Sequence, residues 1–296
     1  MKQIWDSAFA LLLITGLLLG VTLPFGKLAT EAGIPPMLWA FVISFGAGSV
    51  LLVTLKMLGK PFALTPAKLR YYVIAAAISY AIPNILMFSA IPHLGAGYTG
   101  IMFTLSPVIT LLLSILLGVR RPNMLGISGI AVGFVGAVLV AMTRGEAGQP
   151  APLFWVGIGL LLPVSLALGN IYRTVDWPKD AGPIELAVGS HLAAAAMLLV
   201  GLLATGDGGS FAMLREVPAL TFAQVTASSA MFAFFFRLQA VGGPVYLSQM
   251  GYVGAAIGLI SGVLFLGEHY SMLTWIGAAI VVAGVVMTTR AQNRTP

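Results

Sequence analysis

Long apolar segments separated by short polar ones constrain this chain more than any other feature. A helix needs about 20 mostly apolar residues to cross the roughly 30 Å hydrocarbon core of a bilayer. The sequence contains ten such runs, and the connections between them are too short to hold a soluble domain. We therefore predict an all-α, multi-pass membrane protein. The predicted spans are residues 7–29, 36–57, 71–92, 95–118, 123–142, 152–174, 184–205, 219–241, 244–266 and 272–290.

The composition agrees with this prediction. Apolar residues make up 59% of the chain and charged residues 8%, against about 45–50% and about 25% in soluble domains. A water-soluble chain of 296 residues could not bury that much apolar surface. Cysteine is absent, which excludes disulfides, thiolate metal sites and cysteine nucleophiles.

The distribution of positive charge predicts the orientation. Ten spans place both termini on one side of the membrane. If that side is the cytoplasm, twelve of the fifteen Lys and Arg residues face it, and only Lys27, Arg144 and Arg215 face outward. Short cytoplasmic loops carry such an excess of Lys and Arg, so we predict that both termini are cytoplasmic.

An internal repeat divides the chain into halves. Residues 116–144 and 265–290 share an apolar helix ending in Leu-Gly, a polar turn, Met-Leu and a glycine-spaced helix ending in Thr-Arg. The offset is 149 residues before the turn and 148 after it, so we predict repeats over 1–148 and 149–296. The matched glycines are Gly118 with Gly267, Gly129 with Gly277 and Gly136 with Gly284.

The number of spans in each repeat sets its direction. Five is odd, so the second repeat enters the membrane from the opposite side. Inverted repeats are typical of alternating-access transporters, whose substrate site lies near the midplane where the halves meet. Glu268 lies in the polar turn of the second repeat, where the first has Arg120 and Arg121. We therefore interpret Glu268 as a turn residue and not as a catalytic acid.

The same residues resemble the EamA repeat of the drug/metabolite transporter superfamily. The first half carries "SAIPHLGAGYTGIMFTLSPVITLLLSILLG", and the second carries "LQAVGGPVYLSQMGYVGAAIGLISGVLF" followed by "LGE". The chain is most similar to bacterial exporters of the aromatic amino-acid type. The resemblance implies a ten-helix basket around a central cavity, with the fifth helix of each repeat peripheral, in the bacterial inner membrane. Two positions depart from the pattern, Arg120-Arg121 in place of the turn glutamate and Ala256 in place of a mid-helix proline.

Polar and aromatic side chains follow helical stripes deep within several spans. Such groups are costly in lipid, so they face a cavity or another helix. Both outcomes stay open, because hydrogen bonds between helices would explain the stripes equally well. The candidate substrate-binding residues are Tyr80, Asn84, Met87, Tyr98, Thr99, Met102, Ser106, Asn170, Tyr172, Gln249 and Tyr252. These aromatic, amide, hydroxyl and thioether groups surround few formal charges, which favours a small zwitterion or a mixed polar and apolar solute.

Four prolines lie in the interior of predicted spans, away from the ends. A proline removes a backbone donor and can kink a helix, so each is either an ordinary membrane-helix proline or a hinge for the transport cycle. The candidate hinges are Pro24, Pro83, Pro107 and Pro163.

Four ionisable residues lie near or within spans. We interpret Arg173 and Arg237 as side chains that extend to the lipid headgroups, with contact to a substrate carboxylate as the alternative. Lys27 is likewise interpreted as extending to the headgroups, and the alternative is that its charge takes part in a gate at the outer end of the first span. His191 is interpreted as a packed histidine, with proton relay as the alternative.

These features favour a secondary transporter that exports amino acids, including aromatic or neutral ones, by alternating access. No Asp or Glu lies deep in a predicted span, which favours facilitated flux over proton antiport. A broad exporter of drugs or metabolites, including a proton-coupled one, is the alternative. An intramembrane enzyme would need paired acids, a Ser/His arrangement or metal ligands at membrane depth, whereas the deep spans contain one histidine and no carboxylate. A structural scaffold would not explain the inverted repeat with its polar stripes. We expect no cofactor, metal or nucleic-acid partner, and a monomer or weak dimer.

Overall fold

The computed structural model describes residues 5–118, 124–145 and 150–292, and every regular element in these ranges is helical. The predicted boundary between the repeats, at 148/149, lies outside these ranges, as do Lys2, Arg120, Arg121 and Arg294. The elements are α2 (Ala8–Glu31), α3 (Pro36–Met57), α4 (Pro66–Ala76), the π-helical turn η1 (Ala77–Ala81), α5 (Ile82–Leu94), α6 (Ala96–Phe103), α7 (Ser106–Leu116), α8 (Met124–Thr143), α9 (Leu153–Val175), α10 (Pro183–Ala204), the 3₁₀ helix η2 (Asp207–Arg215), α11 (Pro218–Ser248), α12 (Met250–Phe265) and α13 (Met272–Gln292).

The prediction of a helical, multi-pass protein is confirmed. Within the described residues, eight helical segments are long and apolar enough to cross a membrane, and two shorter apolar helices cover Met250–Phe265 and Met272–Gly284. Proline stands at the start of α3, α4 and α10. It is favoured there because its fixed φ suits the first turn and its missing N–H would have no partner.

Several spans are interrupted near their middle. The segment from α4 to α5 passes through the π-helical turn η1, and the turn at Thr104–Leu105 separates α6 from α7. A third interruption of the helix lies at Gln249, between α11 and α12. Within α11, Gly243 has φ 71° and ψ −178°, so the chain bends sharply there.

The four candidate hinge prolines have two kinds of setting. Pro83 and Pro107 stand in the first turns of α5 and α7, directly after two of these interruptions. Pro24 and Pro163 lie inside the continuous helices α2 and α9. The role of all four as hinges stays a prediction.

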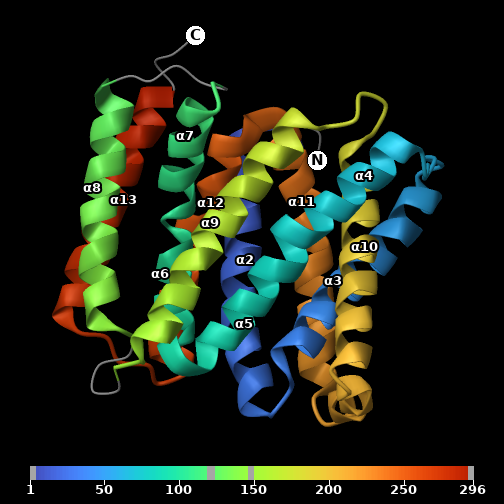
Figure 1. The fold of residues 1–296 in the computed structure, drawn as a ribbon, viewed down its shortest axis with the longest axis horizontal. Coiled ribbons are helices and arrows are strands. Elements are labelled where there is room, and N and C mark those ends of the chain that lie inside the picture. Colours follow the sequence, from blue (N-terminus) through green and yellow to red (C-terminus); the bar gives the residue numbers. More distant parts are fainter. Residues whose placement is uncertain (1–4, 119–123, 146–149, 293–296) are drawn as a thin grey trace.

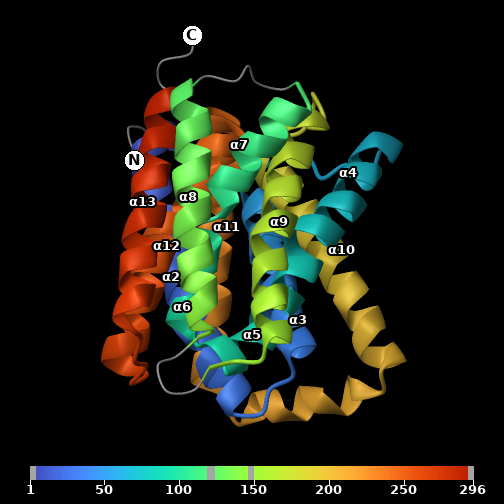
Figure 2. The same cartoon turned by 60° about the vertical axis from the view of Figure 1, so that its left-hand side comes forward.

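Helices α8 and α13 form a pair on one side of the molecule (Figures 1 and 2). Glycines allow their backbones to touch. A Cβ added at Gly136 would lie 2.6 Å from the backbone nitrogen of Val281, and one at Gly284 would overlap the backbone of Gly133. The Gly129–Gly133 pair thus packs against α13 of the same chain.

The remaining helices surround the centre of the molecule. Helix α3 packs against α10, and α2 packs against both α11 and α12. Helix α9 packs against α5 and α7, while α6 packs against α12. Together these contacts bring α2, α5, α9 and α11 around one central space, and the interrupted segments α6–α7 and α11–α12 border it.

Candidate substrate cavity

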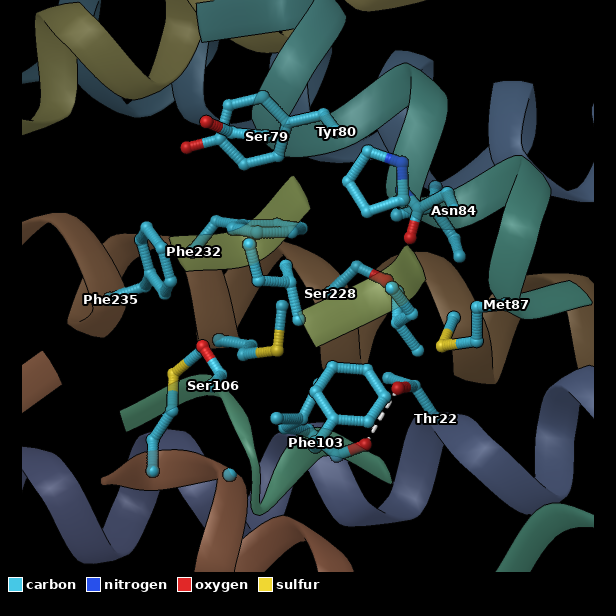
Figure 3. Close-up of a pocket in the computed structure, with 18 of the residues that line it drawn as sticks. Thr22, Ser79, Tyr80, Asn84, Met87, Phe103, Ser106, Ser228, Phe232 and Phe235 are labelled. Carbon is cyan, nitrogen blue, oxygen red and sulfur yellow. Dashed lines mark hydrogen bonds between the residues drawn. The ribbon is translucent and has the colours of Figure 1, made fainter. Parts of the chain in front are cut away.

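A cavity lies at the centre of this arrangement, at the middle of the helix lengths. It encloses about 750 Å³ of space not occupied by atoms, the opening to solvent included. Figure 3 shows Tyr80 and Asn84 on one wall, with Phe103 and Thr22 on the opposite wall. Its lining residues are Leu19, Thr22, Ile43, Ser79, Tyr80, Pro83, Asn84, Met87, Phe103, Ser106, Leu162, Leu166, Asn170, Arg173, Gln224, Ser228, Met231, Phe232, Phe235, Ser248, Met250 and Gly251.

The helix interruptions meet at this cavity. Phe103 and Ser106 flank the break between α6 and α7, and Ser248 and Met250 flank the break between α11 and α12. A Cβ on Gly251 would lie 2.9 Å from the carbonyl oxygen of Phe103, so the two broken segments touch. Backbone irregularity at membrane depth is tolerated where protein or a cavity surrounds it, and transporters build substrate sites from such discontinuous helices.

The structure brings five of the predicted substrate-binding residues into the cavity wall. These are Tyr80, Asn84, Met87, Ser106 and Asn170. They come from η1, α5, α7 and α9, so the stripes predicted on three different spans converge on one space. The candidate hinge Pro83 lines the same wall.

Three predicted residues on α6 lie outside the cavity wall and are buried among helices. The hydroxyl of Tyr98 donates to the carbonyl of Val140 at 2.9 Å. The hydroxyl of Thr99 donates to the carbonyl of Gly95 at 2.8 Å. Met102 packs in the hydrophobic cluster of α6, α8 and α9. Tyr98 and Met102 thus make the helix–helix contacts that were the alternative interpretation, whereas Thr99 bonds within its own helix.

The other three lie at different places. Tyr172 stands near the end of α9, donates to Asp176 Oδ2 at 2.6 Å and stacks on Tyr71. Gln249 sits in the break before α12, next to the lining residue Ser248, and its Nε2 has no hydrogen-bond partner in the described structure. Tyr252 is on α12 but not in the cavity wall, and its buried hydroxyl likewise has no partner there.

Arg173 differs from its predicted setting. The headgroup interpretation is wrong for this residue, because its side chain turns inward and is only 2% exposed. Nε donates to Gln239 Oε1 at 2.9 Å, and Nη2 donates to Asn170 Oδ1 at 2.7 Å. The guanidinium carbon lies 4.9 Å from the ring centroid of Phe235, within cation–π range. Arg173 therefore places a fixed positive charge in the cavity wall.

A stripe on α11 also lines the cavity and was not among the predicted sites. Gln224, Ser228, Met231 and Phe235 are spaced at i, i+4, i+7 and i+11. The Gln224 side chain donates to Ser228 Oγ at 2.7 Å. The stripe rule applied to the other spans would have found this set, because two polar residues one turn apart interrupt an apolar helix.

Several buried polar atoms at the cavity have no hydrogen-bond partner within the described residues. They are Ser79 Oγ, the Tyr80 hydroxyl and Gln224 Oε1. Buried polar groups are nearly always paired in proteins, because an unpaired one costs about 1–3 kcal/mol. Unpaired groups in a cavity wall are therefore available to a solute.

His191 lies behind this wall and not in it. Its ring centroid is 4.2 Å from that of Tyr80 and 3.9 Å from that of Phe232. Both ring nitrogens are buried without a partner in the described structure. The imidazole therefore supports two lining aromatic rings by packing.

A buried ion pair closes one end of the molecule. Glu268 is 0% exposed, and its Oε1 lies 2.8 Å from Lys27 Nζ. The same carboxylate accepts the backbone N–H groups of Ala96 at 2.6 Å and Gly97 at 2.9 Å, and also the Tyr270 hydroxyl. Burial opposes ionisation, but these donors outweigh it and lower the pKa of Glu268. The turn location is confirmed, and the turn joins α2 to the start of α6.

Lys27 also departs from the headgroup interpretation. Its side chain is 13% exposed, and it points at Glu268 instead of outward. At the opposite end of the molecule, three further ion pairs connect helix ends: Lys68 with Glu185, Arg70 with Asp176, and Arg237 with Asp6. The pKa of Asp176 is lowered, because donation from Tyr172 and Arg70 outweighs its partial burial.

No group of three or more His, Cys, Asp or Glu side chains placed to hold a metal ion occurs in the described part of the chain. Apolar spanning helices, broken segments and a polar, aromatic cavity at mid-depth together define a membrane protein built to handle a small solute. Residues 6–142 match the EamA-like transporter family. This stretch carries an EamA domain of the drug/metabolite transporter superfamily.

Two further comparisons find proteins that this chain resembles over most of its length. The chain is 22% identical to Protein PecM of Dickeya dadantii (strain 3937) over 254 residues, which cover 85% of this chain and 82% of that protein. A crystal structure aligns with a TM-score of 0.66 at 18% identity, over 98% of this chain and 100% of the other. At that identity, the structural likeness establishes the fold alone.

Proposed function

We propose that this transporter exports amino acids, including aromatic and neutral ones, through the central cavity by alternating access. The observation that carries the proposal is the cavity itself, where hydroxyl, amide and aromatic groups meet at two broken helices. Hydroxyl and amide groups suit the polar end of an amino acid. The apolar and aromatic lining suits its side chain.

Alternating access requires two halves that exchange roles, and the helix contacts support such a relation. Helix α2 packs on α11, and its counterpart α9 packs on α5. Helix α2 also packs on α12, while α9 packs on α7. Backbone geometry agrees, because Gly95 and Gly243, which are 148 residues apart, both have positive φ, as do Gly118 and Gly267, 149 apart. We infer two inverted repeats of five spans, 1–148 and 149–296.

The proposed location is the bacterial inner membrane, with both termini in the cytoplasm. Lys68, Arg70 and Arg237 lie at one end of the molecule, while Lys27 lies at the other. This asymmetry supports the orientation by the positive-inside rule.

Facilitated flux is the proposed mode of transport. The described lining residues include no Asp or Glu, and membrane carboxylates are the usual carriers of coupled protons. A broader exporter of drugs or metabolites is the second candidate. Its support is the set of flexible thioethers in the wall, Met87, Met231 and Met250, since methionine adapts to varied ligands.

The test is flux of a labelled amino-acid panel in liposomes that contain the purified protein, with and without a pH gradient. Saturable counterflow of aromatic or neutral amino acids, independent of the gradient, is the expected result. Accumulation driven by the gradient would contradict the facilitative mode. Absence of amino-acid flux, together with flux of other organic solutes, would replace the first candidate with the second.

A further inference from the structure

Arg173 is a buried cation that lacks a carboxylate partner among the described residues. The ion pairs in the described structure join Lys27, Lys68, Arg70 and Arg237 to acids, and none of them includes Arg173. Burying a charge is costly unless a counter-charge or several hydrogen bonds compensate it. Here two amide oxygens and an aromatic face provide part of that compensation.

The neighbours of Arg173 also fix the direction of its guanidinium. Gln239, which accepts from Nε, is itself held, because its Nε2 donates to Thr174 Oγ1 at 2.8 Å and to the Asn170 carbonyl at 3.2 Å. Asn170 accepts from Nη2 at 2.7 Å. Within the described residues, Nη1 of Arg173 donates no hydrogen bond. A planar guanidinium held at two nitrogens presents the third in a fixed direction.

A hydroxyl stands beside this free nitrogen. A Cβ built on Gly169 would overlap Ser79 Oγ and would lie 3.1 Å from Arg173 Nη1, so both groups border the same point of α9. Ser79 Oγ has no hydrogen-bond partner among the described residues, and neither does the adjacent Tyr80 hydroxyl. Figure 3 shows the Ser79 and Tyr80 side chains on the same edge of the cavity. One cation with two unpaired hydroxyls is a donor set suited to a carboxylate.

The rest of the cavity favours an apolar body. Leu162 and Arg173 both line it from α9, and eleven residues of helix span about 16 Å. The wall also contains Leu19, Phe103 and Met250. No Asp or Glu occurs among the described lining residues, so a substrate ammonium group would meet only neutral acceptors.

We infer that Arg173 recognises the carboxylate of the transported solute, and that the site selects small monocarboxylates with an apolar or aromatic body whether or not they carry an amine. This inference rests on the proposed transport function and narrows it. An amino acid and its deaminated acid should both bind. The matching amine should not, because its positive charge would face Arg173.

The test compares three probes that share one ring: 3-phenylpropanoate, phenylalanine and 2-phenylethylamine. Calorimetric titration of the full-length protein in nanodiscs at pH 7 should show the acid binding at least as tightly as the amino acid. The amine should bind at least tenfold more weakly than the acid. An amine that binds as tightly as the acid would overturn the inference without the need for any variant.

Variants then locate the effect. Arg173→Gln should weaken the binding of 3-phenylpropanoate at least tenfold. The affinity of Arg173→Lys should lie between those of wild type and Arg173→Gln, because lysine keeps the charge and loses the planar guanidinium. Arg237→Gln is the matched control, since this arginine pairs with Asp6 and is not among the residues that line the cavity. An unchanged acid affinity in folded Arg173→Gln would overturn the inference. If Arg173→Gln does not fold, Gly169→Ala is the substitute, and it should also weaken binding of the acid. An unchanged acid affinity in Gly169→Ala would overturn the inference.

Flux of the same probes in liposomes separates this inference from the proposed function. Transport of the amine in preference to the acid would overturn the carboxylate site and leave a transporter of another solute class. Neither binding nor flux of any of the three would overturn both the inference and the amino-acid proposal.

Discussion

The ion pair between Lys27 and Glu268 should contribute strongly to folding stability. Its two charged atoms are 2.8 Å apart, and Glu268 is fully buried. With an effective dielectric of about 20, Coulomb's law gives about 6 kcal/mol for unit charges at this separation. Desolvation of both groups offsets much of this energy. We expect a coupling free energy of about 2 kcal/mol.

A double-mutant cycle measures this coupling directly. Glu268→Gln should lower the free energy of unfolding by about 3 kcal/mol, because it removes the carboxylate from a largely buried ion pair. Lys27→Met removes the other partner, and the double variant closes the cycle. The assay is a reversible denaturant titration of the protein in mixed micelles.

A matched pair gives the control. Arg70 and Asp176 also form an ion pair, but the Arg70 side chain is 61% exposed. The same cycle with Arg70→Gln and Asp176→Asn should show no measurable coupling, since water screens exposed pairs. If Lys27 and Glu268 couple by less than about 0.5 kcal/mol, the assignment of this buried pair as a structural lock is refuted.

Three other outcomes follow from the structure. The pKa of Glu268 is lowered from its usual 4.5, so the difference in unfolding free energy between wild type and Glu268→Gln should be complete above pH 4.5 and shrink as the pH falls through the folded-state pKa. Denaturant titrations from pH 7 to pH 3.5 measure this difference. A difference that grows towards acid pH would contradict the prediction. Gly262→Ala should lower the free energy of unfolding by about 1–3 kcal/mol, because the new Cβ would overlap the Glu268 carboxylate. Gly157→Ala is the control: its Cβ would meet nothing within 4 Å, so the same titration should show unchanged or higher stability. Asn84→Ala should reduce flux about tenfold at normal expression if its amide contacts the solute, while Tyr252→Phe, outside the cavity wall, should leave flux unchanged.

Part of the site was predictable from local pattern alone. Tyr80, Asn84 and Met87 follow helical spacing on one span, and the structure places all three in the cavity wall. The same rule selected Thr99 and Met102, which are buried outside the cavity wall. Spacing shows which residues share a face of a helix, but it does not show which neighbour that face meets.

The sequence by itself determined the helical, membrane-spanning character of this protein, because apolar runs of about 20 residues have few other stable fates. It also located the turn that holds Glu268. Only the tertiary structure decided what the charged groups do. Glu268 meets Ala96 and Lys27, which are 172 and 241 residues away in the chain. Arg173 turns inward because Gln239, 66 residues away, accepts its Nε hydrogen. Such pairings depend on helix packing, which no local pattern encodes.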